Sequence, residues 1–593
     1  MSQITSFMLF PRSTIIVVLL LFLLVSLVSS TPPEDPIKCS SPNNTTCTIT
    51  NSYGIFPDRS ECKASRVVYA ATEQELVSTI AELTKNKTKM KVATRFSHSI
   101  PKLVCPEGQN GILISTKYLN KILKVDVNAR TITVESGVTL KQLINEASKF
   151  GLVLPYTPYW WGLSIGGLIG TGAHGSTLFG KGSSVHDYVL ELRIVVPSSS
   201  QDGFARVLSL DQQNEDLNAA KVSLGVLGVI SQVSSFTYFE LEPMFKRSIT
   251  YLTKDDSDLG EKVGTFGHEH EFADMIWYPS QHKVVYRVDD RVPLATSGNG
   301  LYDFIPFRPT SSVELALVRT TEDIQESTSD ANGKCLLAKT TTSTLLNAAY
   351  GLSNNGIIFT GYPVIGFQNR LQASGTCLDS LQDAKITACA WDSRIKGEFF
   401  HQTTFSIGLS QAKNFIEDVQ KLVQLEPKGL CGMEIYNGIL MRYVTASSAY
   451  LGKQEDAIDF DITYYRSKDP FAPRLYEDIL EEIEQLGIFK YGGLPHWGKN
   501  RNLAFEGVIK RYKNFQKFLK VKERYDPQGL FSSEWSDQVL GIKGSVTILK
   551  DGCALEGLCI CSQDSHCNPS KGYFCRPGKV YKEARVCTRL KST

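Results

Sequence analysis

Charge of one sign and long apolar runs are both scarce in this chain of 593 residues. Lysine and arginine number 63 against 61 aspartates and glutamates, which leaves a net charge of +2. A surface for nucleic acid or for an anionic membrane is therefore not predicted. No apolar segment follows Cys587, so we expect no C-terminal lipid anchor. At this length we expect two large domains and an accessory piece.

A long apolar run does stand near the N-terminal end. Arg12 precedes the apolar residues Ile15 to Val25, and Val28-Ser29-Ser30 offers small residues where a signal peptidase reads. This order is typical of a cleaved secretory signal, predicted for residues 1–30, and no membrane anchor is expected after its removal. A retained signal anchor is the alternative.

Fourteen cysteines fall into three groups with an even number in each, as disulfide pairing within domains requires. The sequons at Asn43, Asn44 and Asn86 also favour the secretory pathway. No metal site is expected, because His268-Glu269-His270 lacks a third ligand at a suitable spacing. The groups are Cys39, Cys47, Cys62 and Cys105; Cys335, Cys377, Cys389 and Cys431; and Cys553, Cys559, Cys561, Cys567, Cys575 and Cys587.

Glycine is concentrated between Gly162 and Gly175, where it takes six of fourteen positions. Core packing does not explain such a run, whereas close approach of a ligand to the backbone does, and successive N–H groups form an anion cradle. A diphosphate is the expected occupant. Two alternatives remain: a glycine-rich turn between a strand and a helix, and the dinucleotide fingerprint Gly170–Gly175 with Glu191 about 20 residues on. Against the latter, about a hundred residues of folded chain precede the fingerprint, which normally opens its domain.

Apolar spacing predicts a mixed α/β region followed by an antiparallel sheet. Residues 72–83 and 139–150 repeat apolar residues at helical spacing, and residues 122–135 read as a hairpin. From about Pro243 the chain changes to longer alternating runs, the pattern of a sheet with one covered face. Further elements are expected as a buried strand at 189–196, strands at 272–278 and 284–288, and helices at 415–423, 476–486 and 507–524.

Four stretches together are similar to the L-gulonolactone oxidase family of FAD-dependent aldonolactone oxidoreductases, particularly its secreted plant members. Ser97-His98-Ser99 resembles a Gly-His-Ser turn, and His496-Trp497-Gly498-Lys499 matches the signature His-Trp-x-Lys. Residues 438–443 resemble a Glu-x-Arg strand, and residues 526–531 resemble a closing turn. The likeness covers roughly Val67 to Trp535.

The resemblance implies an α+β fold of the vanillyl-alcohol-oxidase type: a two-lobed α/β FAD-binding domain, an antiparallel-sheet cap domain and a small disulfide-rich C-terminal module. The expected divisions are residues 1–30 (signal peptide), 31–62 (cysteine-containing segment), 63–243 (FAD-binding domain), 244–487 (substrate-binding cap), 488–540 (return segment completing the FAD site) and 541–593 (disulfide-rich tail).

FAD is the implied cofactor, bonded covalently through His98. An imidazole on a rigid turn is a competent nucleophile toward the flavin methyl carbon. The absence of cysteine between Leu154 and Gly167 argues against a second covalent attachment. The other implied cofactor contacts are Ser97, Ser99, Gly137, Val138, Thr139, Ser164, Gly166, Gly167, Gly170, Gly172, Ala173, His174, Gly228, Ile230 and Lys499.

The implied catalytic residues are Lys499, Arg442, His496 and Glu434. A lysine beside the flavin stabilises the anion that forms on hydride transfer. Arg442 matches the arginine of Glu-x-Arg, but Leu440 stands where the glutamate should. We expect Glu434 to supply that carboxylate, if the turn at Asn437-Gly438 brings it back beside Arg442; an ordinary surface acid is the alternative.

The implied activity is oxidation of an aldonolactone, L-gulonolactone, to an ascorbate precursor. A hydride passes from C2–H to FAD, a base removes the hydroxyl proton, and O₂ becomes hydrogen peroxide. A polyol or sugar oxidase of the same fold is one rival, and a flavin-bearing cell-wall or receptor-like protein with little turnover is another. The expected location is the secretory pathway, extracellular or cell wall, or vacuole. The oligomeric state is not predicted.

Overall fold

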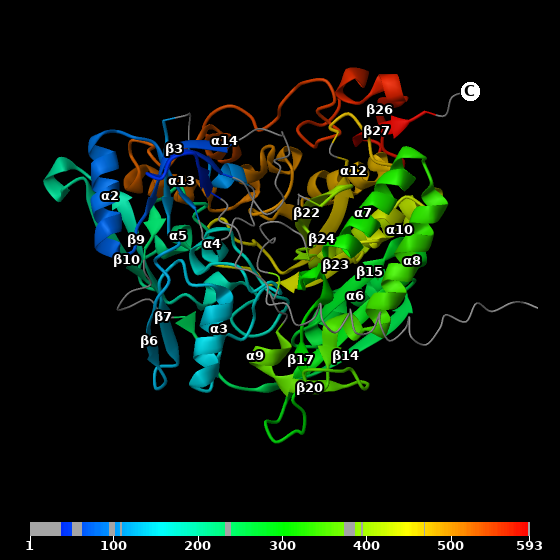
Figure 1. The fold of residues 1–593 in the computed structure, drawn as a ribbon, viewed down its shortest axis with the longest axis horizontal. Coiled ribbons are helices and arrows are strands. Elements are labelled where there is room, and N and C mark those ends of the chain that lie inside the picture. The colour runs from blue at the N-terminus through cyan, green and yellow to red at the C-terminus, as the bar shows by residue number, and fades with distance from the viewer. Residues whose placement is uncertain are drawn as a thin grey trace, which may run out of the picture.

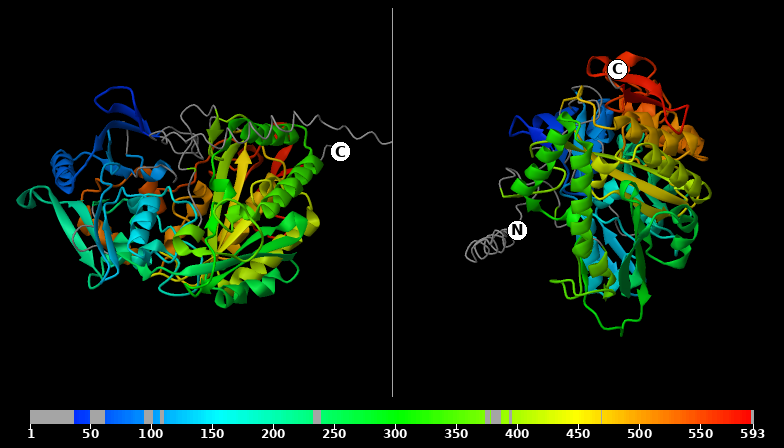
Figure 2. Two further views of the ribbon diagram at one scale, coloured as in Figure 1. Left: turned by 60° about the horizontal axis from the view of Figure 1, so that its bottom comes forward. Right: turned by 90° about the vertical axis from the view of Figure 1, so that its right-hand side faces the viewer.

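The computed structural model describes most of the chain as two large lobes side by side, with a small C-terminal module above them (Figures 1 and 2). The predicted signal segment and Ser97, His98 and Ser99 lie outside the described residues. The described residues are 37–49, 62–93, 101–106, 110–231, 239–372, 377, 386–392, 395–467 and 469–590.

The first lobe contains a mixed five-stranded sheet of order β1-β2-β3-β5-β4. Its strands β3, β5 and β4, of which β4 is the edge strand, are parallel. The predicted helix is confirmed as α2 (Glu73–Lys85), which is capped by Thr72 and buries Leu76, Ile80 and Leu83. The strands are β1 (Ile37–Cys39), β2 (Thr45–Ile49), β3 (Cys62–Tyr69), β4 (Met90–Ala93) and β5 (Ile112–Ser115).

Three small antiparallel sheets complete this lobe, and the predicted hairpin and second helix are both found. The order β10-β9-β11 is antiparallel throughout, so the rival reading as a parallel nucleotide-binding sheet is wrong. Glu191 accepts a hydrogen bond from Ser209 on the neighbouring strand. The elements are β6 (Ile122–Asp126), β7 (Thr131–Val134), α3 (Leu140–Lys149), β8 (Leu152–Val153), α4 (Ile165–Gly170), β9 (Glu191–Pro197), β10 (Ala205–Asp211), α5 (Leu217–Ala220), β11 (Val229–Ile230), β12 (Phe239–Glu240) and β13 (Glu242–Pro243).

The second lobe is built on an antiparallel eight-stranded sheet of order β20-β14-β16-β15-β23-β24-β22-β25. Helices α6 (Leu259–Glu269) and α10 (Leu409–Leu425) pack against one of its faces. The strands are β14 (Lys246–Asp255), β15 (Asp274–Tyr278), β16 (Lys283–Val292), β20 (Val364–Phe367), β22 (Phe399–Gly408), β23 (Ile439–Val444), β24 (Ala457–Arg466) and β25 (Leu494–Pro495).

Alternation along the central strands divides apolar from charged residues. Met441, Phe460 and Ile462 belong to the apolar cluster beneath α6 and α10. Because successive side chains point to opposite faces, Arg442 and Asp461 lie on the other face of the sheet. That face lines the cavity described below.

A helical hairpin that the sequence did not predict, α7 (Ser312–Ser327) and α8 (Ala331–Asn347), lies beside this sheet. Its apolar pattern is inverted: Val313 and Leu317 are exposed, whereas Arg319 and Glu322 are buried. Periodicity therefore gave no helix signal. Short elements elsewhere are β17 (Leu301–Tyr302), β18 (Thr310–Ser311), β19 (Leu352–Ser353), α9 (Gln368–Leu371), β21 (Thr387–Ala388) and α11 (Cys431–Glu434).

The return segment differs from its prediction in one helix. The helix expected from residue 507 begins only at Phe515, as α13 (Phe515–Tyr525), because Tyr512 is extended and separates it from a 3₁₀ turn at Val508–Arg511. The helix expected over 476–486 is confirmed as α12 (Glu477–Gln485), and α14 (Glu534–Val539) follows α13. No helix among the described residues is both long enough and apolar enough to cross a membrane.

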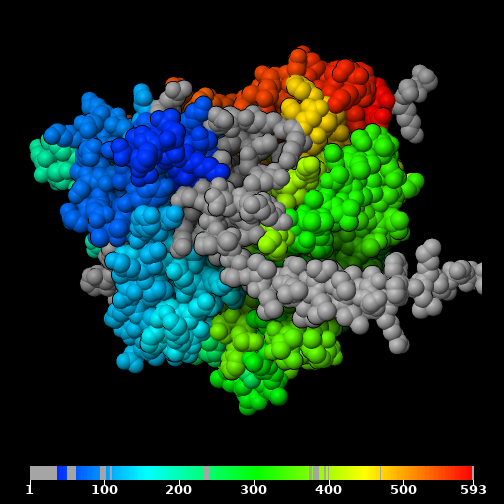
Figure 3. Space-filling view, viewed as in Figure 1, coloured from blue at the N-terminus to red at the C-terminus, as the bar shows by residue number. Residues whose placement is uncertain are grey.

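The tail is a disulfide-linked module around the hairpin β26 (Tyr573–Pro577) and β27 (Arg585–Arg589). It packs on α12, where the buried carboxylate of Glu482 accepts hydrogen bonds from three successive backbone N–H groups, those of residues 579–581. Figure 3 shows the module, in red, seated on the second lobe. The predicted pairing within groups is confirmed: Cys39–Cys47, Cys62–Cys105, Cys335–Cys431, Cys377–Cys389, Cys553–Cys559, Cys561–Cys575 and Cys567–Cys587.

Candidate active site

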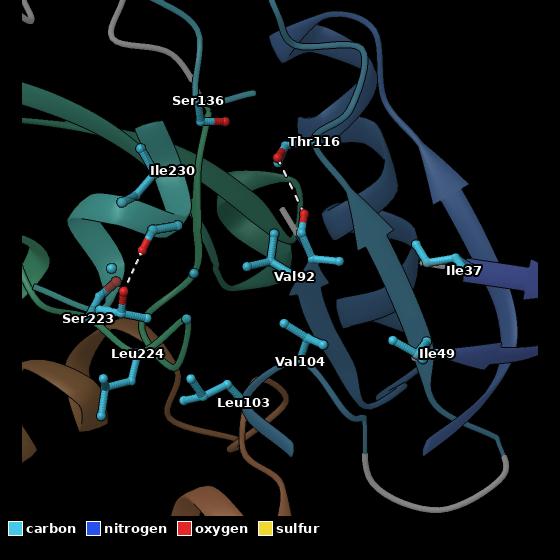
Figure 4. Close-up of a pocket in the computed structure, with 17 residues that line it drawn as sticks. Ile37, Ile49, Val92, Leu103, Val104, Thr116, Ser136, Ser223, Leu224 and Ile230 are labelled. Atoms are coloured by element: carbon cyan, nitrogen blue, oxygen red, sulfur yellow. Dashed lines mark hydrogen bonds between the residues drawn. The ribbon is translucent and has the colours of Figure 1, made fainter. Parts of the chain in front are cut away.

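A first cavity lies within the first lobe, between the five-stranded sheet and the glycine-rich helix α4 (Figure 4). Among the described residues, no charged side chain lines it. Its wall is made of glycines, small hydroxyl side chains and aliphatic residues: Ile37, Ile49, Val92, Ala93, Leu103, Val104, Thr116, Ser136, Gly166, Gly167, Gly170, Thr171, Ser223, Leu224, Gly225, Gly228 and Ile230.

The wall of this cavity fits a dinucleotide cofactor such as FAD. The Oγ of Ser136 is buried without a hydrogen-bond partner among the described residues, which makes it a donor available to a ligand. A Cβ added at Gly166 would lie 3.0 Å from the Ser136 Cβ, and one at Gly228 would lie 2.4 Å from the Val195 carbonyl oxygen. Backbone therefore approaches backbone closely here, as a phosphate cradle requires.

The predicted cofactor contacts divide into two sets. Gly166, Gly167, Gly170, Gly228 and Ile230 line the first cavity, and Ala173 and His174 line the second. The remainder support these walls from behind. They are Gly137, packed on the Thr116 carbonyl; Val138, whose carbonyl accepts from Ile165; Thr139, which caps α3; Ser164, the N-cap of α4; and Gly172, at φ +71°.

A second cavity of about 340 Å³ opens where the two lobes meet and shares Thr171 with the first. It holds charged and aromatic side chains from both lobes. Its lining includes His174, Gln402, Leu440, Arg442, Asp461, His496 and Lys499. The two cavities therefore adjoin at Thr171.

The charged end of this cavity is a salt-bridged cluster. Lys499 Nζ lies 2.6 Å from Asp461 Oδ2. Arg442 Nη2 lies 2.8 Å from Asp459 Oδ2 and 3.4 Å from Asp461 Oδ2. Lys453 lies near Asp459 and donates to the Leu494 carbonyl at 3.3 Å; burial lowers its pKa to about 8, so it is still charged at neutral pH. Arg442 and Lys499 are thus balanced by the two carboxylates, and Lys453 adds one positive charge beside them.

Two histidines beside this cluster are neutral at neutral pH. Burial lowers the pKa of His174 to about 3, and burial together with Lys499 holds the pKa of His496 well below its ordinary value. Burial alone would raise the pKa of Asp459, but His174, Arg442 and Lys453 hold it below its ordinary range. The excess charge is thus carried by lysine and arginine.

The loop that carries His496 and Lys499 is fixed at several points. The indole N–H of Trp497 donates to the Leu451 carbonyl at 2.9 Å, and its ring stacks on Tyr512. Asn500 donates to the carbonyls of Thr404 and His496, at 2.8 and 3.1 Å. These contacts explain why tryptophan and asparagine flank the lysine.

The disulfide module supports the same loop from the far side. The Leu503 N–H donates to the Gly557 carbonyl at 3.0 Å, and Asn502 donates to the Val546 carbonyl at 2.8 Å. Arg501 forms an ion pair with Glu484, and a Cβ at Gly557 would fall 2.3 Å from the Arg501 Cδ. The tail is therefore part of the wall behind the site.

The expected pairing of Glu434 with Arg442 is wrong. The Glu434 carboxylate is fully buried and accepts hydrogen bonds from the Ser280 N–H at 2.5 Å and from Gln281 Nε2 at 3.0 Å. The turn at Asn437-Gly438 does form, with φ of +88° and +66°, but it separates α11 from β23 instead of folding one onto the other. Burial raises the pKa of Glu434 to about 7.

Sequence reasoning missed the two carboxylates that Arg442 does bind. Asp459 and Asp461 alternate in the otherwise apolar strand Ala457–Arg466. Carboxylates two residues apart on a buried strand share one face and need cationic partners there, and this signal was available in the sequence. Gln402, which donates to Asp461 Oδ1 at 2.6 Å, was missed as well.

Family comparisons agree with both lobes and with the tail. The FAD binding domain model matches residues 64–201, the D-arabinono-1,4-lactone oxidase model matches residues 379–539, and the model of the L-gulonolactone oxidase 2-like C-terminal domain matches residues 550–589. These matches support FAD as the cofactor of the first lobe.

Relatives and solved structures extend the comparison. The chain is 66% identical over 97% of its length to Probable L-gulonolactone oxidase 6 of Arabidopsis thaliana, covering 95% of that protein. It is 64% identical to L-gulonolactone oxidase 2 of the same plant, over 98% of each chain. A solvent-stable cholesterol oxidase shares the fold, with a TM-score of 0.62 at 15% identity over 86% of this chain and 100% of that one. The chain belongs to the L-gulonolactone oxidase family of FAD-dependent oxidoreductases, with the vanillyl-alcohol-oxidase-type fold that the sequence predicted.

Proposed function

We propose that this protein oxidises an aldonolactone, L-gulonolactone, to an ascorbate precursor and reduces O₂ to hydrogen peroxide. The alcohol carbon becomes a carbonyl as it loses a hydride, and its hydroxyl loses a proton. The two electrons and two protons leave as hydrogen peroxide. The observation that carries the proposal is the pair of cations, Lys499 and Arg442, which Asp461 and Asp459 hold at the charged end of the second cavity.

When bound, FAD supplies the hydride acceptor and passes the electrons to O₂. The residues of this chain supply position and charge. Lys499 provides a fixed cation where negative charge develops, and its contribution is large because the cavity excludes water. Arg442 has a buried Nε without a hydrogen-bond partner in the described part of the chain, which is a donor for a substrate oxygen.

Covalent attachment of FAD through His98 is part of the proposal. Its support is the likeness of Ser97-His98-Ser99 to the Gly-His-Ser turn. The purified protein is expected to stay yellow through acid precipitation and denaturing gels, and His98→Ala should release the flavin. Flavin that washes away from the wild type on denaturation would disprove the bond without disproving FAD binding.

Passage through the secretory pathway is also proposed, with an extracellular, cell-wall or vacuolar destination. Seven disulfides pair every cysteine of the chain, which an oxidising compartment allows. Asn43, Asn44 and Asn86 are exposed, so their sequons are accessible to glycosylation. A shift in mass on glycosidase treatment of protein from its native source tests this.

A peroxide-coupled screen of lactones, polyols and sugars tests the proposed reaction. L-Gulonolactone is expected to bleach the flavin under anaerobic conditions and to yield peroxide in air. Bleaching without peroxide would point to a different electron acceptor. A faster polyol or sugar would assign the protein to another substrate class, and no bleaching with any of them would contradict the proposal.

A further inference from the structure

Asp461 occupies a position that joins both cations of the active site. We propose that Asp461 is the positioning residue that holds Lys499 and Arg442 in the cavity, and that it brings from β24 the carboxylate that β23 lacks at Leu440. This inference rests on the flavin chemistry of the proposed function, but not on the identity of the substrate.

The strand register explains how β24 supplies this carboxylate. In the antiparallel pair of β23 and β24, Leu440 lies directly opposite Asp461, and Arg442 lies directly opposite Asp459. Directly opposed residues place their side chains on the same face, with Cβ atoms about 5 Å apart. A carboxylate at position 461 therefore reaches the same space as one at position 440 would.

The hydrogen bonds of Asp461 show that it acts through its neighbours. Its Oδ2 accepts from Lys499 Nζ at 2.6 Å and from Arg442 Nη2 at 3.4 Å. Its Oδ1 accepts from Gln402 Nε2 at 2.6 Å and from Thr404 Oγ1 at 3.0 Å. Four donors occupy the lone pairs of a carboxylate, so Asp461 fixes two cations and leaves them to contact the ligands.

Asp459 provides a natural comparison on the same strand. It also binds Arg442, but its other neighbours are Ser406 at 2.8 Å and His174 at 3.6 Å, and it is fully buried behind the cavity wall. Among the described residues, Asp461 is the one carboxylate within salt-bridge distance of Lys499. A flexible lysine stem thus depends on Asp461 for its position.

A double-mutant cycle tests this dependence. Asp461→Asn is expected to slow anaerobic flavin reduction about tenfold, the size of a coupling between contacting charges. In a Lys499→Met background the same substitution should change the rate clearly less than it does in the wild type, because one of the two cations through which Asp461 acts is gone. The substrate is whichever compound of the screen reduces the wild type fastest.

The midpoint potential of bound FAD provides the same cycle without any substrate. Lys499→Met should lower the midpoint potential by more in the wild-type background than in the Asp461→Asn background, because only the wild type holds the ammonium of Lys499 beside the flavin. This readout separates the two proposals, because it works even if no lactone, polyol or sugar is oxidised. Simply additive effects in both cycles would overturn the role of Asp461.

A rescue variant distinguishes the loss of a positioning carboxylate from misfolding. Leu440→Glu placed in Asp461→Asn should restore part of the lost rate, because it returns a carboxylate to the same face from the opposite strand. FAD content per chain monitors folding in each variant. Should Asp461→Asn fail to load FAD, the exchange variant Leu440→Glu with Asp461→Leu keeps the charge balance, and failure of both the rescue and the exchange would contradict the proposal.

Discussion

The two cavities of this molecule are built from different materials. Among the described residues, the first has no charged side chain in its wall, which consists of glycines, small hydroxyl side chains and aliphatic residues. The second brings together Arg442, Asp461 and Lys499 from three segments far apart in the sequence. The glycines of the first cavity and the cations Arg442 and Lys499 stand in motifs that can be read from the sequence, whereas strand register places the carboxylate that joins the two cations.

The largest effect is expected where the charge itself is removed. Lys499→Met should keep FAD and slow flavin reduction by about two to three orders of magnitude, the cost of losing one aimed charge-stabilising donor. Stopped-flow reduction under anaerobic conditions measures this. Lys510→Met, at an exposed lysine on the same return segment, is the control and should leave the rate unchanged. Equal rates for both variants would remove Lys499 from the site.

A larger side chain in the wall of the first cavity should weaken FAD binding and leave the charged cluster of the second cavity unchanged. A Cβ at Gly170 has only the Ser223 Oγ within 4 Å, at 3.8 Å, so valine there projects into the first cavity without a clash in the protein. Gly170→Val should weaken FAD binding by roughly tenfold to a hundredfold, the cost of about 1–3 kcal/mol of overpacking.

Flavin absorbance per chain, with thermal unfolding of the apoprotein, measures the effect of Gly170→Val. The control is Gly264→Val on the exposed face of α6, where a Cβ would meet no atom within 4 Å. Full flavin content in Gly170→Val would show that the cofactor does not pass this wall.

Glu434 lies outside the charged cavity, so a substitution of this residue tests where the cavity ends. Its pKa is raised from 4.5 to about 7 by burial. The native state therefore keeps a proton that the unfolded state has lost as pH rises from 4.5 to 7, so stability falls across this window. The loss is on the order of 3 kcal/mol. Glu434→Gln should flatten this slope in denaturant unfolding and leave turnover intact; an unchanged slope or lost turnover would contradict the placement.

The smallest effect is expected where the C-terminal tail supports the loop that carries Lys499. Gly557→Ala combines a φ of +64° with a Cβ 2.3 Å from the Arg501 Cδ, and should cost about 1–3 kcal/mol of stability and several-fold in turnover. Gly572→Ala has a similar φ of +81° but no atom closer than 3.8 Å. Turnover should fall only in the former; identical turnover would show that the tail is an accessory.

The difference between features set by neighbours in sequence and features set by partners in space explains how much of the fold and of the site could be predicted from the sequence. The glycine run, the helices α2 and α3, the disulfide groups and the position of Lys499 all depend on neighbours in sequence, and all were found. The placement of Glu434 was wrong because a predicted turn does not fix the direction of the next strand. Asp461 was missed because its role depends on which strand pairs with β23, which one sequence does not state.

The hairpin α7–α8 was missed for a different reason. Arg319 and Glu322 are buried on α7 where apolar residues would be expected, and each is paired: Arg319 donates to the carbonyls of Asp392 and Glu398, and Glu322 binds Arg474. Polar networks that satisfy buried charges reverse the usual pattern of a helix. Tertiary partners, which the sequence does not show, decided this element.

The contact between Gly557 and the loop that carries Lys499 also affects the order in which the protein is completed during synthesis. A chain grows from its N-terminal end, so the cofactor cradle of the first lobe is synthesised several hundred residues before the module that supports Lys499. The carbonyls of Val546 and Gly557 reach Asn502 and Leu503 only when the last fifty or so residues have emerged and their cysteines have paired. The core of the first lobe itself takes residues from Leu494 to Val546, so the cofactor cradle and the support of Lys499 both become complete only at the end of synthesis, and the onset of activity should report that synthesis and oxidation of the chain are complete.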